Sequence, residues 1–545
     1  MKKSSIHRFG VCLYLVLALT PLFGQIPPTL PQQPPSALRV TTRLVEVNVI
    51  VEDKAGQPVS DLKREDFILL DKGREQPIAF FSREATALPR APAPPLPPNT
   101  FTNRWEQSTT SPASATAIFL DGLNTRWADQ PYARQQIVKF LKQLQPQDCV
   151  ALYALGQGLR VVHDFTQDAT ALLAALAEDE KHLAAGATES EIEEPETGWR
   201  QFDAWMGEVN RGVAEKYRAD RALRTIRSLL AIANHLERLP GRKNLVWVAG
   251  SFPSWFNRGS VPTPEKLREG HNNFDPEIER AARALGNANV AIYPVDARGV
   301  LAPEEFSPEQ GSISREARGP AGREFGPMLE LAERTGGRAF YNTNDIRGAI
   351  RRAVDDSRVT YVLAYYPTHG AWDGRFREIK VQVKRPGLQV RHRRGYFALP
   401  EEPAEASYRR GILDAAMWSP TDASRLGLTV RAVPVATALE LELRLDPRDI
   451  TLQQQEGRWV GTLDKMIVQL APGEKNLKGV SHVISLRLDE PTYRQMIQMG
   501  ALVLTERLEV APGAKLLRVL VRDLPSGALG SVTVPLSHIW PERNS

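Results

Sequence analysis

The stretch ATAIFLDGLNTR, residues 115–126, decides which fold the sequence predicts. Its apolar run Ala117–Leu120 stops at Asp121, Asn124 and Thr125 follow at once, and a helical pattern then begins. A short apolar run of this kind is typical of a buried strand in a parallel sheet. The loop after such a strand is where α/β folds place ligands, and its oxygen-bearing side chains suit Mg²⁺ or Ca²⁺. Turn formation and helix capping are the competing roles for the same side chains.

The same rhythm of strand and helix continues on both sides of this stretch. Amphipathic helical segments separate the apolar runs, and an antiparallel edge hairpin is expected at Leu159–Phe165. The further strands are predicted at Cys149–Leu155, Asn244–Val248, Val290–Val295 and Thr360–Tyr366. The predicted fold class is α/β, with a doubly wound, mostly parallel sheet in residues 114–398.

Residues on either side of this α/β domain have the alternating pattern of β structure. The run RLVEVNVIVED predicts a small N-terminal β domain at residues 39–84, and seven or so alternating strands predict an immunoglobulin-like β-sandwich at residues 426–545. Pro-rich segments separate these parts, because repeated prolines preclude a packed element. The expected connecting segments are a spacer at 25–38 and linkers at 85–113 and 399–425.

The first 24 residues are typical of a secretory signal peptide. Lys2, Lys3 and Arg8 precede the apolar core Phe9–Leu19, and Gly24 is a small residue suited to cleavage. Export to the periplasm or to the outside of the cell is therefore expected. No later segment reaches the length of a transmembrane helix.

Net charge argues against nucleic acid as the partner. The chain carries +5, and removing the three basic residues of the leader leaves +2, which is no electrostatic footprint for a polyanion. After the leader, Cys149 is the only cysteine, and its apolar surroundings indicate a small buried hydrophobe.

Catalytic signatures are absent from the sequence. It contains no HExxH, GxSxG, GxxxxGK[ST] or Cys-x-x-Cys pattern, and its nine histidines are scattered. We therefore predict a protein that is not an enzyme. A hydrolase using Asp121 or Asp296 is the alternative from the enzyme class.

As a set, seven stretches resemble the von Willebrand factor type A family, and in particular the VWFA-related proteins abundant in acidobacteria. These are VNVIVEDKAGQPVSDLKREDFILLDKG (47–73), FLDGLNT (119–125), LPGRKNLVWVAGSFP (239–253), VAIYPVDARG (290–299), LAERTGGRAFYNTND (331–345) and YVLAYYP (361–367) with the later HRRGYF (392–397). The resemblance covers most of residues 40 to 398 and implies a doubly wound sheet with a metal-ion-dependent adhesion site at its strand ends.

The resemblance also implies which residues would hold a metal. Asp121 matches the leading Asp of the family's Asp-x-Ser-x-Ser motif, but Leu123 replaces the first Ser and Thr125 the second. Asn124 is an additional oxygen donor. The Thr of the family's second loop has only a poor candidate, Thr225, for which a helix-surface role is the competing interpretation.

The family's later Asp is also missing. Gly250 and Ser251 occupy its place, and Asp296 at the end of a neighbouring strand is a substitute carboxylate, with turn formation or capping as its competing role. One carboxylate with neutral oxygens binds a divalent ion weakly. The expected metal residues are Asp121, Asn124, Thr125, Ser251 and Asp296, with Mg²⁺ or Ca²⁺ as the ion.

These observations predict an exported binding protein of the adhesion type. The strand-end loops would engage a protein partner, with a degenerate metal site as the means of contact. An envelope scaffold that keeps the fold and has lost the metal is the alternative.

Overall fold

The computed structural model describes residues 44–85, 96–104, 114–184, 220–239, 242–251, 281–300, 322–398 and 406–540, except residues 282, 283, 287, 357, 370, 371, 437 and 472–474. All of them belong to one compact unit, Arg43–Ser545. The expected signal peptide and the spacer at 25–38 lie outside the described residues. Within those residues, every helix is too short or too polar to cross a membrane.

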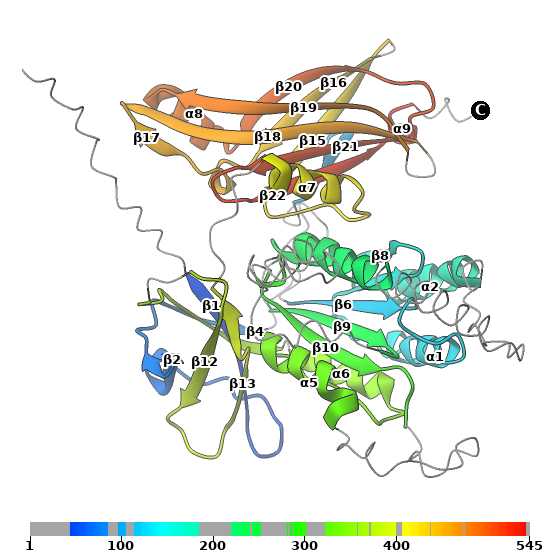
Figure 1. The fold of residues 1–545 in the computed structure, drawn as a ribbon, viewed down its shortest axis with the longest axis vertical. Coiled ribbons are helices and arrows are strands. Elements are labelled where there is room, and N and C mark those ends of the chain that lie inside the picture. The colour runs from blue at the N-terminus through cyan, green and yellow to red at the C-terminus, as the bar shows by residue number, and fades with distance from the viewer. Residues whose placement is uncertain are drawn as a thin grey trace, which may run out of the picture. The chain divides into compact units, whose positions relative to one another are not determined.

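A five-stranded sheet is built around β6 (Figure 1). Its strands are β6 (Ser114–Asp121), β7 (Val150–Leu155), β8 (Leu159–Thr166), β9 (Arg242–Ala249) and β10 (Val290–Asp296). They lie in the order β10-β9-β6-β7-β8, and every neighbouring pair is parallel except β7 with β8. A parallel bridge from Val295 to Phe340 extends the sheet beyond β10. Numbered along the chain, this is the 3-2-1-4-5 order of a doubly wound sheet, with the antiparallel edge that the sequence predicts.

Helices cover both faces of this sheet (Figure 1). In β6, Ile118 and Leu120 pack on one face, and Ala117 and Phe119 pack on the other. The first face carries α1 (Gln130–Leu141), α2 (Ala169–Ala184) and α6 (Ile346–Asp355), and the second carries the helix at 220–236 and α5 (Gly322–Thr335). Because both faces are covered, β6 is apolar without alternation, which explains its sequence pattern.

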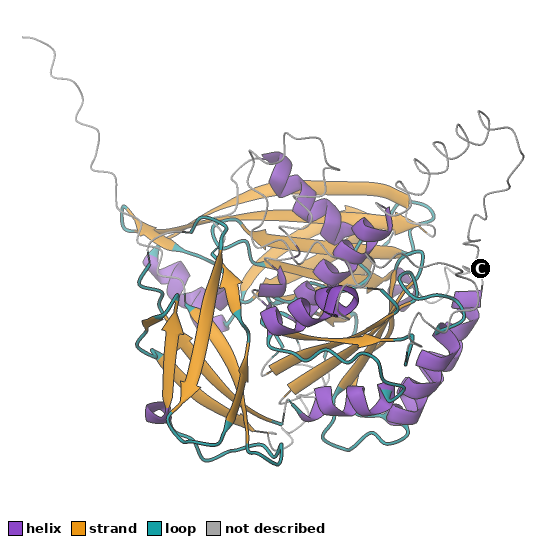
Figure 2. Cartoon of the chain, turned by 60° about the horizontal axis from the view of Figure 1, so that its bottom comes forward, coloured by secondary structure: helices purple, strands orange, loops and turns teal. Residues whose placement is uncertain are grey.

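A small β domain, the group of strands at the left of Figure 2, is assembled from two distant stretches of chain, which are blue and yellow-green in Figure 1. One sheet has the order β13-β1-β11-β4 and the other β14-β12-β2-β3, and both contribute to one apolar core. The amino-terminal strands are β1 (Val45–Glu52), β2 (Phe67–Asp71), β3 (Arg74–Glu75) and β4 (Phe80–Ala85). The later strands are β11 (Val359–Tyr365), β12 (Phe376–Val383), β13 (Gln389–His392) and β14 (Gly395–Phe397).

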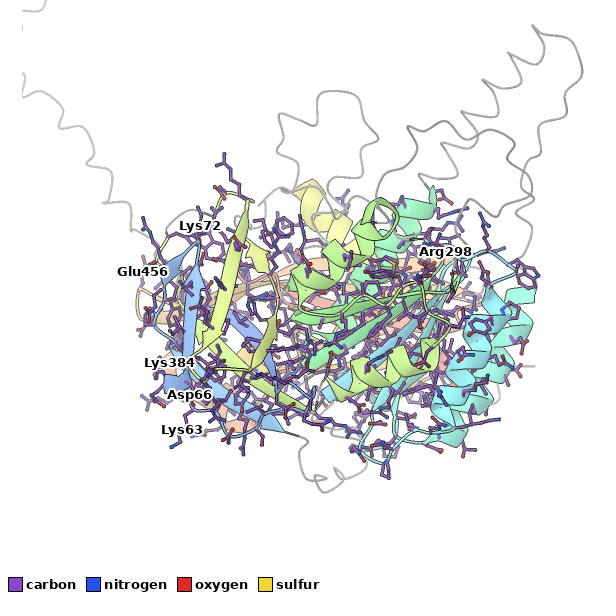
Figure 3. The ribbon with its side chains drawn as sticks, turned by 90° about the horizontal axis from the view of Figure 1, so that it is seen from below. Lys63, Asp66, Lys72, Arg298, Lys384 and Glu456 are labelled. Carbon is purple, nitrogen blue, oxygen red and sulfur yellow. The ribbon has the colours of Figure 1, made fainter. Side chains whose placement is uncertain are left out.

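Side-chain and backbone contacts join the two stretches of this domain. Asp66 Oδ2 accepts from the Lys63 N–H at 2.7 Å, and the Asp66 carbonyl accepts from the Lys384 N–H at 2.9 Å. Figure 3 shows these three residues next to one another. The hydroxyl of Tyr361 in β11 likewise donates to the Val59 carbonyl at 2.9 Å.

The strand expected at 360–366 does not belong to the parallel sheet. β11 instead pairs antiparallel with β1, from Val45 opposite Tyr365, and with β4. Nearly all of β11 is buried. A short, fully buried apolar run has the same pattern in a parallel sheet and in the middle of a covered antiparallel one, so the sequence did not distinguish them.

Two sheets that share one core form the carboxyl-terminal domain. They have the orders β20-β16-β15-β5 and β17-β18-β21-β22, and β19 pairs with β18. The first sheet contains β5 (Thr100–Thr102), β15 (Leu428–Val435), β16 (Ala438–Leu445) and β20 (Leu502–Glu509). The second contains β17 (Gln453–Gln455), β18 (Arg458–Ala471), β19 (Lys475–Leu488), β21 (Leu516–Asp523) and β22 (Leu529–Pro535). The accompanying helices are α7 (Ala406–Met417), α8 (Glu490–Met499) and α9 (Leu536–Ile539).

One element of this domain comes from the segment expected to be an unpacked linker. β5 pairs antiparallel with β15, and Asn103 fixes its end. The Asn103 amide donates to the carbonyls of Ala423 and Leu426 at 2.6 and 2.9 Å, and its Oδ1 accepts from the Leu428 N–H at 2.7 Å. Between Pro98 and Pro112 the linker contains no proline, so residues 100–104 are free to form a short edge strand.

Candidate functional site at the strand ends

Asp121 lies at the end of β6, and N–H donors occupy both of its carboxylate oxygens. Oδ1 accepts from the Asn124 backbone N–H at 3.0 Å, and Oδ2 accepts from the Asn124 side-chain amide at 2.7 Å. Trp247, in the middle of β9, donates its indole Nε1–H to the same Oδ2 at 2.9 Å. A carboxylate only accepts, so it fixes the orientation of the Asn124 amide.

Burial and these hydrogen-bond donors shift the pKa of Asp121 in opposite directions. The side chain is 1% exposed, and burial raises its pKa to about 6. The hydrogen bonds from Asn124 and Trp247 and the positive charge of Arg221 oppose that rise. Three donors around one buried carboxylate stabilise its ionised form, so this group is satisfied within the protein.

Asn124 and Thr125 clamp the β6 loop to the end of β9. The Asn124 carbonyl accepts from the N–H groups of Gly250 and Ser251 at 3.1 and 3.0 Å, and from the Ser251 hydroxyl at 3.3 Å. The Thr125 hydroxyl donates to the Asp121 carbonyl at 2.6 Å and accepts from the Gly250 N–H at 3.1 Å. Four of the five expected metal residues therefore meet, but they bond to one another.

Thr225 belongs to this cluster despite its weak sequence signal. It is 1% exposed on the helix at 220–236, so it is not a helix-surface residue. Its hydroxyl accepts from the Asn124 amide at 2.9 Å and donates to the Arg221 carbonyl at 3.0 Å. Thr225 therefore joins the hydrogen-bonded cluster at the end of β6.

Asp296 is not brought to Asp121. β9 lies between β10 and β6, so the two backbones are about 10 Å apart at the 4.7–4.9 Å spacing of neighbouring strands. The carboxylate accepts from the Arg298 backbone N–H at 2.9 Å and from its guanidinium at 3.0 and 2.8 Å. Figure 3 labels Arg298, whose guanidinium pairs with Asp296 at the end of β10. Turn formation, the competing role, is what the structure shows.

This donor set does not fit a divalent cation as it stands. Both oxygens of Asp121 accept from N–H groups, Asp296 is paired with Arg298, and the Ser251 hydroxyl donates to a carbonyl. Nowhere in the described residues do three or more His, Cys, Asp or Glu side chains gather closely enough to hold a metal. Ca²⁺ and Mg²⁺ need free oxygen ligands in larger number.

The sequence left three important side chains unassigned. The hydrogen bond of Trp247 could not be predicted, because an indole in an apolar strand is expected to be part of the core. Arg298 follows Asp296 by two residues, and this Asp-x-Arg spacing was a usable signal. Gln130 at the start of α1 donates to the carbonyls of Gly122 and Thr125, both at 3.0 Å, and supports the loop from the other side.

The loops around this cluster expose large apolar side chains. Trp127 after β6, Val300 after β10 and Tyr341 after the Phe340 bridge are 55%, 57% and 38% exposed. Asn344 connects the loop of Tyr341 to the loop of Val300 and to α1, because its Oδ1 accepts from the Val300 N–H at 3.0 Å and its carbonyl accepts from the hydroxyl of Tyr132 in α1 at 2.5 Å. The loops at these strand ends therefore present two aromatic residues and a valine.

No family model and no curated protein sequence matches the chain. Among solved structures, a von Willebrand factor type A protein from Catenulispora acidiphila is 12% identical, covering 84% of this chain and 74% of that chain at a TM-score of 0.24. The conserved hypothetical protein BatB from Bacteroides thetaiotaomicron is 15% identical, and the match covers 45% of this chain and 98% of that chain at a TM-score of 0.24. The pilus adhesin SpaC from Lactobacillus rhamnosus GG is 8% identical, and the match covers 78% of this chain and 57% of that chain at a TM-score of 0.28. With scores this low, the fold assignment rests on the strand order.

Proposed function

We propose that this chain is an exported, non-enzymatic binding protein of the adhesion or scaffold type, which engages a protein partner through its strand-end loops without a divalent cation. The exposed Trp127, Val300 and Tyr341, on loops fixed to a rigid sheet, carry this proposal. Loops on a rigid scaffold are common binding surfaces, and Trp and Tyr are enriched where binding energy concentrates.

The carboxylates of Asp121 and Asp296 already accept hydrogen bonds from this chain, which favours a binding function that needs no metal ion. They would therefore hold no cation whose coordination a carboxylate of the partner could complete. The junction of Asp121, Asn124 and Trp247 would instead hold the loops in one geometry before a partner arrives, which lowers the ordering cost of binding. The finer resemblance to VWFA-related acidobacterial proteins and the expected export form part of this proposal.

Calorimetric titration of Mg²⁺, Ca²⁺ and Mn²⁺ into the full chain without its leader tests the metal question. We expect no binding to the wild type. Metal binding that Asp121→Asn abolishes, while the variant keeps its fold, would support a metal-dependent adhesion site and overturn the metal-independent form.

Capture experiments test the loops. Proteins retained from an envelope fraction by the wild type in EDTA should be lost by the variant Trp127→Ser/Val300→Ser/Tyr341→Ser. A matched control is Val433→Ser, which removes an exposed valine from β15 in the other domain. Equal retention by the loop variant and the wild type would contradict the assignment of the binding surface.

A further inference from the structure

β19 leaves a long backbone edge without a partner in the described part of the chain. This strand of 14 residues pairs with β18 from Leu488 opposite Trp459 to Lys475 opposite Ala471. Among the described residues, no second strand pairs with it, and none of the backbone hydrogen bonds made outside the strand ladders involves its residues. Such an edge presents a row of N–H and C=O groups to any extended chain that approaches.

Another edge of the same domain shows how such a strand is usually protected. β22, the outer strand of the same sheet, is covered by the segment before β15, where Ser424 bridges to Gly530. Asp422 Oδ2 in that segment also accepts from the Thr533 N–H at 3.1 Å. At the edge of the other sheet, β5 has only three residues. Within the described residues, β19 has neither protection.

The side chains of β19 indicate the charge of a matching strand. Residues 475–488 contain Lys475, Lys478, His482 and Arg487 and no Asp or Glu. Lys478 and Arg487 are exposed. An incoming strand with acidic side chains would therefore find an opposite charge at both ends of the described edge.

Apolar surface on β19 is incompletely covered by its own domain. On the face that contributes to the core, Leu486 is buried, but Val480 and Ile484 are only half-buried. On the opposite face Val483 is 62% exposed. A strand added next to β19 would continue both faces of the sheet and shield these side chains from water.

We propose that β19 binds an extended acidic segment of a partner protein by β-strand addition. Main-chain hydrogen bonds would supply affinity, and Lys478 and Arg487 would supply the preference for acidic side chains. A second copy of this chain is a poor occupant, because an antiparallel pair of β19 strands would place basic residues near basic residues. This surface lies on the carboxyl-terminal domain and does not depend on the function of the strand-end loops.

A peptide titration tests this proposal on the full chain without its leader. The probe is a peptide of about twelve alternating Glu and Val residues, long enough to span most of β19. The controls are the equivalent Lys and Val peptide, and the acidic peptide methylated on alternate backbone nitrogens. We expect fluorescence anisotropy to detect binding of the unmodified acidic peptide alone.

Charge reversal on the edge should weaken that binding. Lys478→Glu/Arg487→Glu is expected to reduce the affinity at least about tenfold, because like charges would then face each other. Arg431→Glu is the matched control, since Arg431 is exposed on β15, whose two edges pair with β16 and β5. The control should bind as the wild type does.

Four outcomes would overturn the proposal. Equal binding of the methylated peptide would show attraction between charges without strand addition. Equal affinity of the double variant would place the peptide elsewhere. A dimer in sedimentation that Arg487→Glu abolishes would make a second copy the occupant. Absence of any peptide binding would leave the edge without this function.

Discussion

The strand ends of the doubly wound sheet and the edge of β19 differ in what they leave unpaired. At the strand ends, the Asp121 and Asp296 carboxylates each accept from N–H donors of the same chain. Along β19, a strand of 14 residues, only the side that faces β18 is paired among the described residues. A region that satisfies its own polar groups can fix the position of other parts, whereas a region that leaves them unpaired can recruit a new chain.

The largest loss of stability is expected when the junction of Asp121, Asn124 and Trp247 is broken. Asp121→Ala removes the acceptor of three N–H groups, those of the Trp247 indole, the Asn124 side-chain amide and the Asn124 backbone, at the buried end of β6. Each buried donor left unpaired costs about 1–3 kcal/mol, so we expect a loss of about 3 kcal/mol in the free energy of unfolding. Urea denaturation measures it.

Glu180→Ala is the control for that measurement. Glu180 is an exposed carboxylate on α2, and its removal should change stability by less than about 0.5 kcal/mol. A loss in Asp121→Ala no larger than in this control would mean that the junction does not hold the loops.

The same substitution at two valines compares an open edge with a closed strand. Val519→Ala in β21 removes a fully buried side chain from a strand paired on both sides, so we expect a loss of about 2 kcal/mol. Val483→Ala in β19 removes a side chain that is 62% exposed, and less than about 0.5 kcal/mol is expected. A large loss at Val483, measured by the same urea denaturation, would show that the edge of β19 is covered.

The smallest effect is expected from His235, as a dependence of stability on pH, because its partner Asp164 is 63% exposed and solvent screens the pair. Its Nε2 lies 3.2 Å from Asp164 Oδ1, and its Nδ1 lies 2.9 Å from the Asp422 carbonyl oxygen. Burial opposes its charge, but these two partners outweigh burial and raise its pKa from 6.5 to about 9. The pair therefore contributes fully below pH 6.5, and its contribution is lost as the pH rises through about 9.

Denaturation midpoints across that pH range in the wild type and in His235→Gln measure this contribution. The difference between the two proteins should shrink as the pH rises and vanish once the histidine is neutral. A constant difference would assign His235 a packing role, in line with its stacking on Phe165 at 6.3 Å between ring centroids.

The strands that could be predicted from the sequence are those whose burial requires a recognisable pattern of apolar residues. β6, β7, β9 and β10 are buried on both faces, so their apolar runs are unbroken. Local sequence also explains the end of α5, because Gly336-Gly337 directly follows its last residue, Thr335. Gly336 has a φ of +79°, and a Cβ at Gly337 would lie 1.9 Å from the Ile292 carbonyl oxygen, so only glycine fits there.

Pairing partners were harder to predict than the elements. The sequence identified β11 as a strand, but it gave no signal that β1 and β4, far earlier in the chain, are its neighbours. At the site, chain order did not reveal that β9 separates Asp296 from Asp121. The expected metal residues were found as a group because four of them lie on two adjacent loops, whereas their mutual hydrogen bonds depend on side-chain geometry.

The split construction of the small β domain has a consequence for how the chain matures. Leu62 and Tyr361, which bond within that domain, are 299 residues apart, and the whole doubly wound sheet lies between its two stretches. As the chain emerges from its amino end, β1 to β4 must wait for β11 to β14, and loop closure over such a distance slows folding. Until then their unpaired strand edges are open to aggregation.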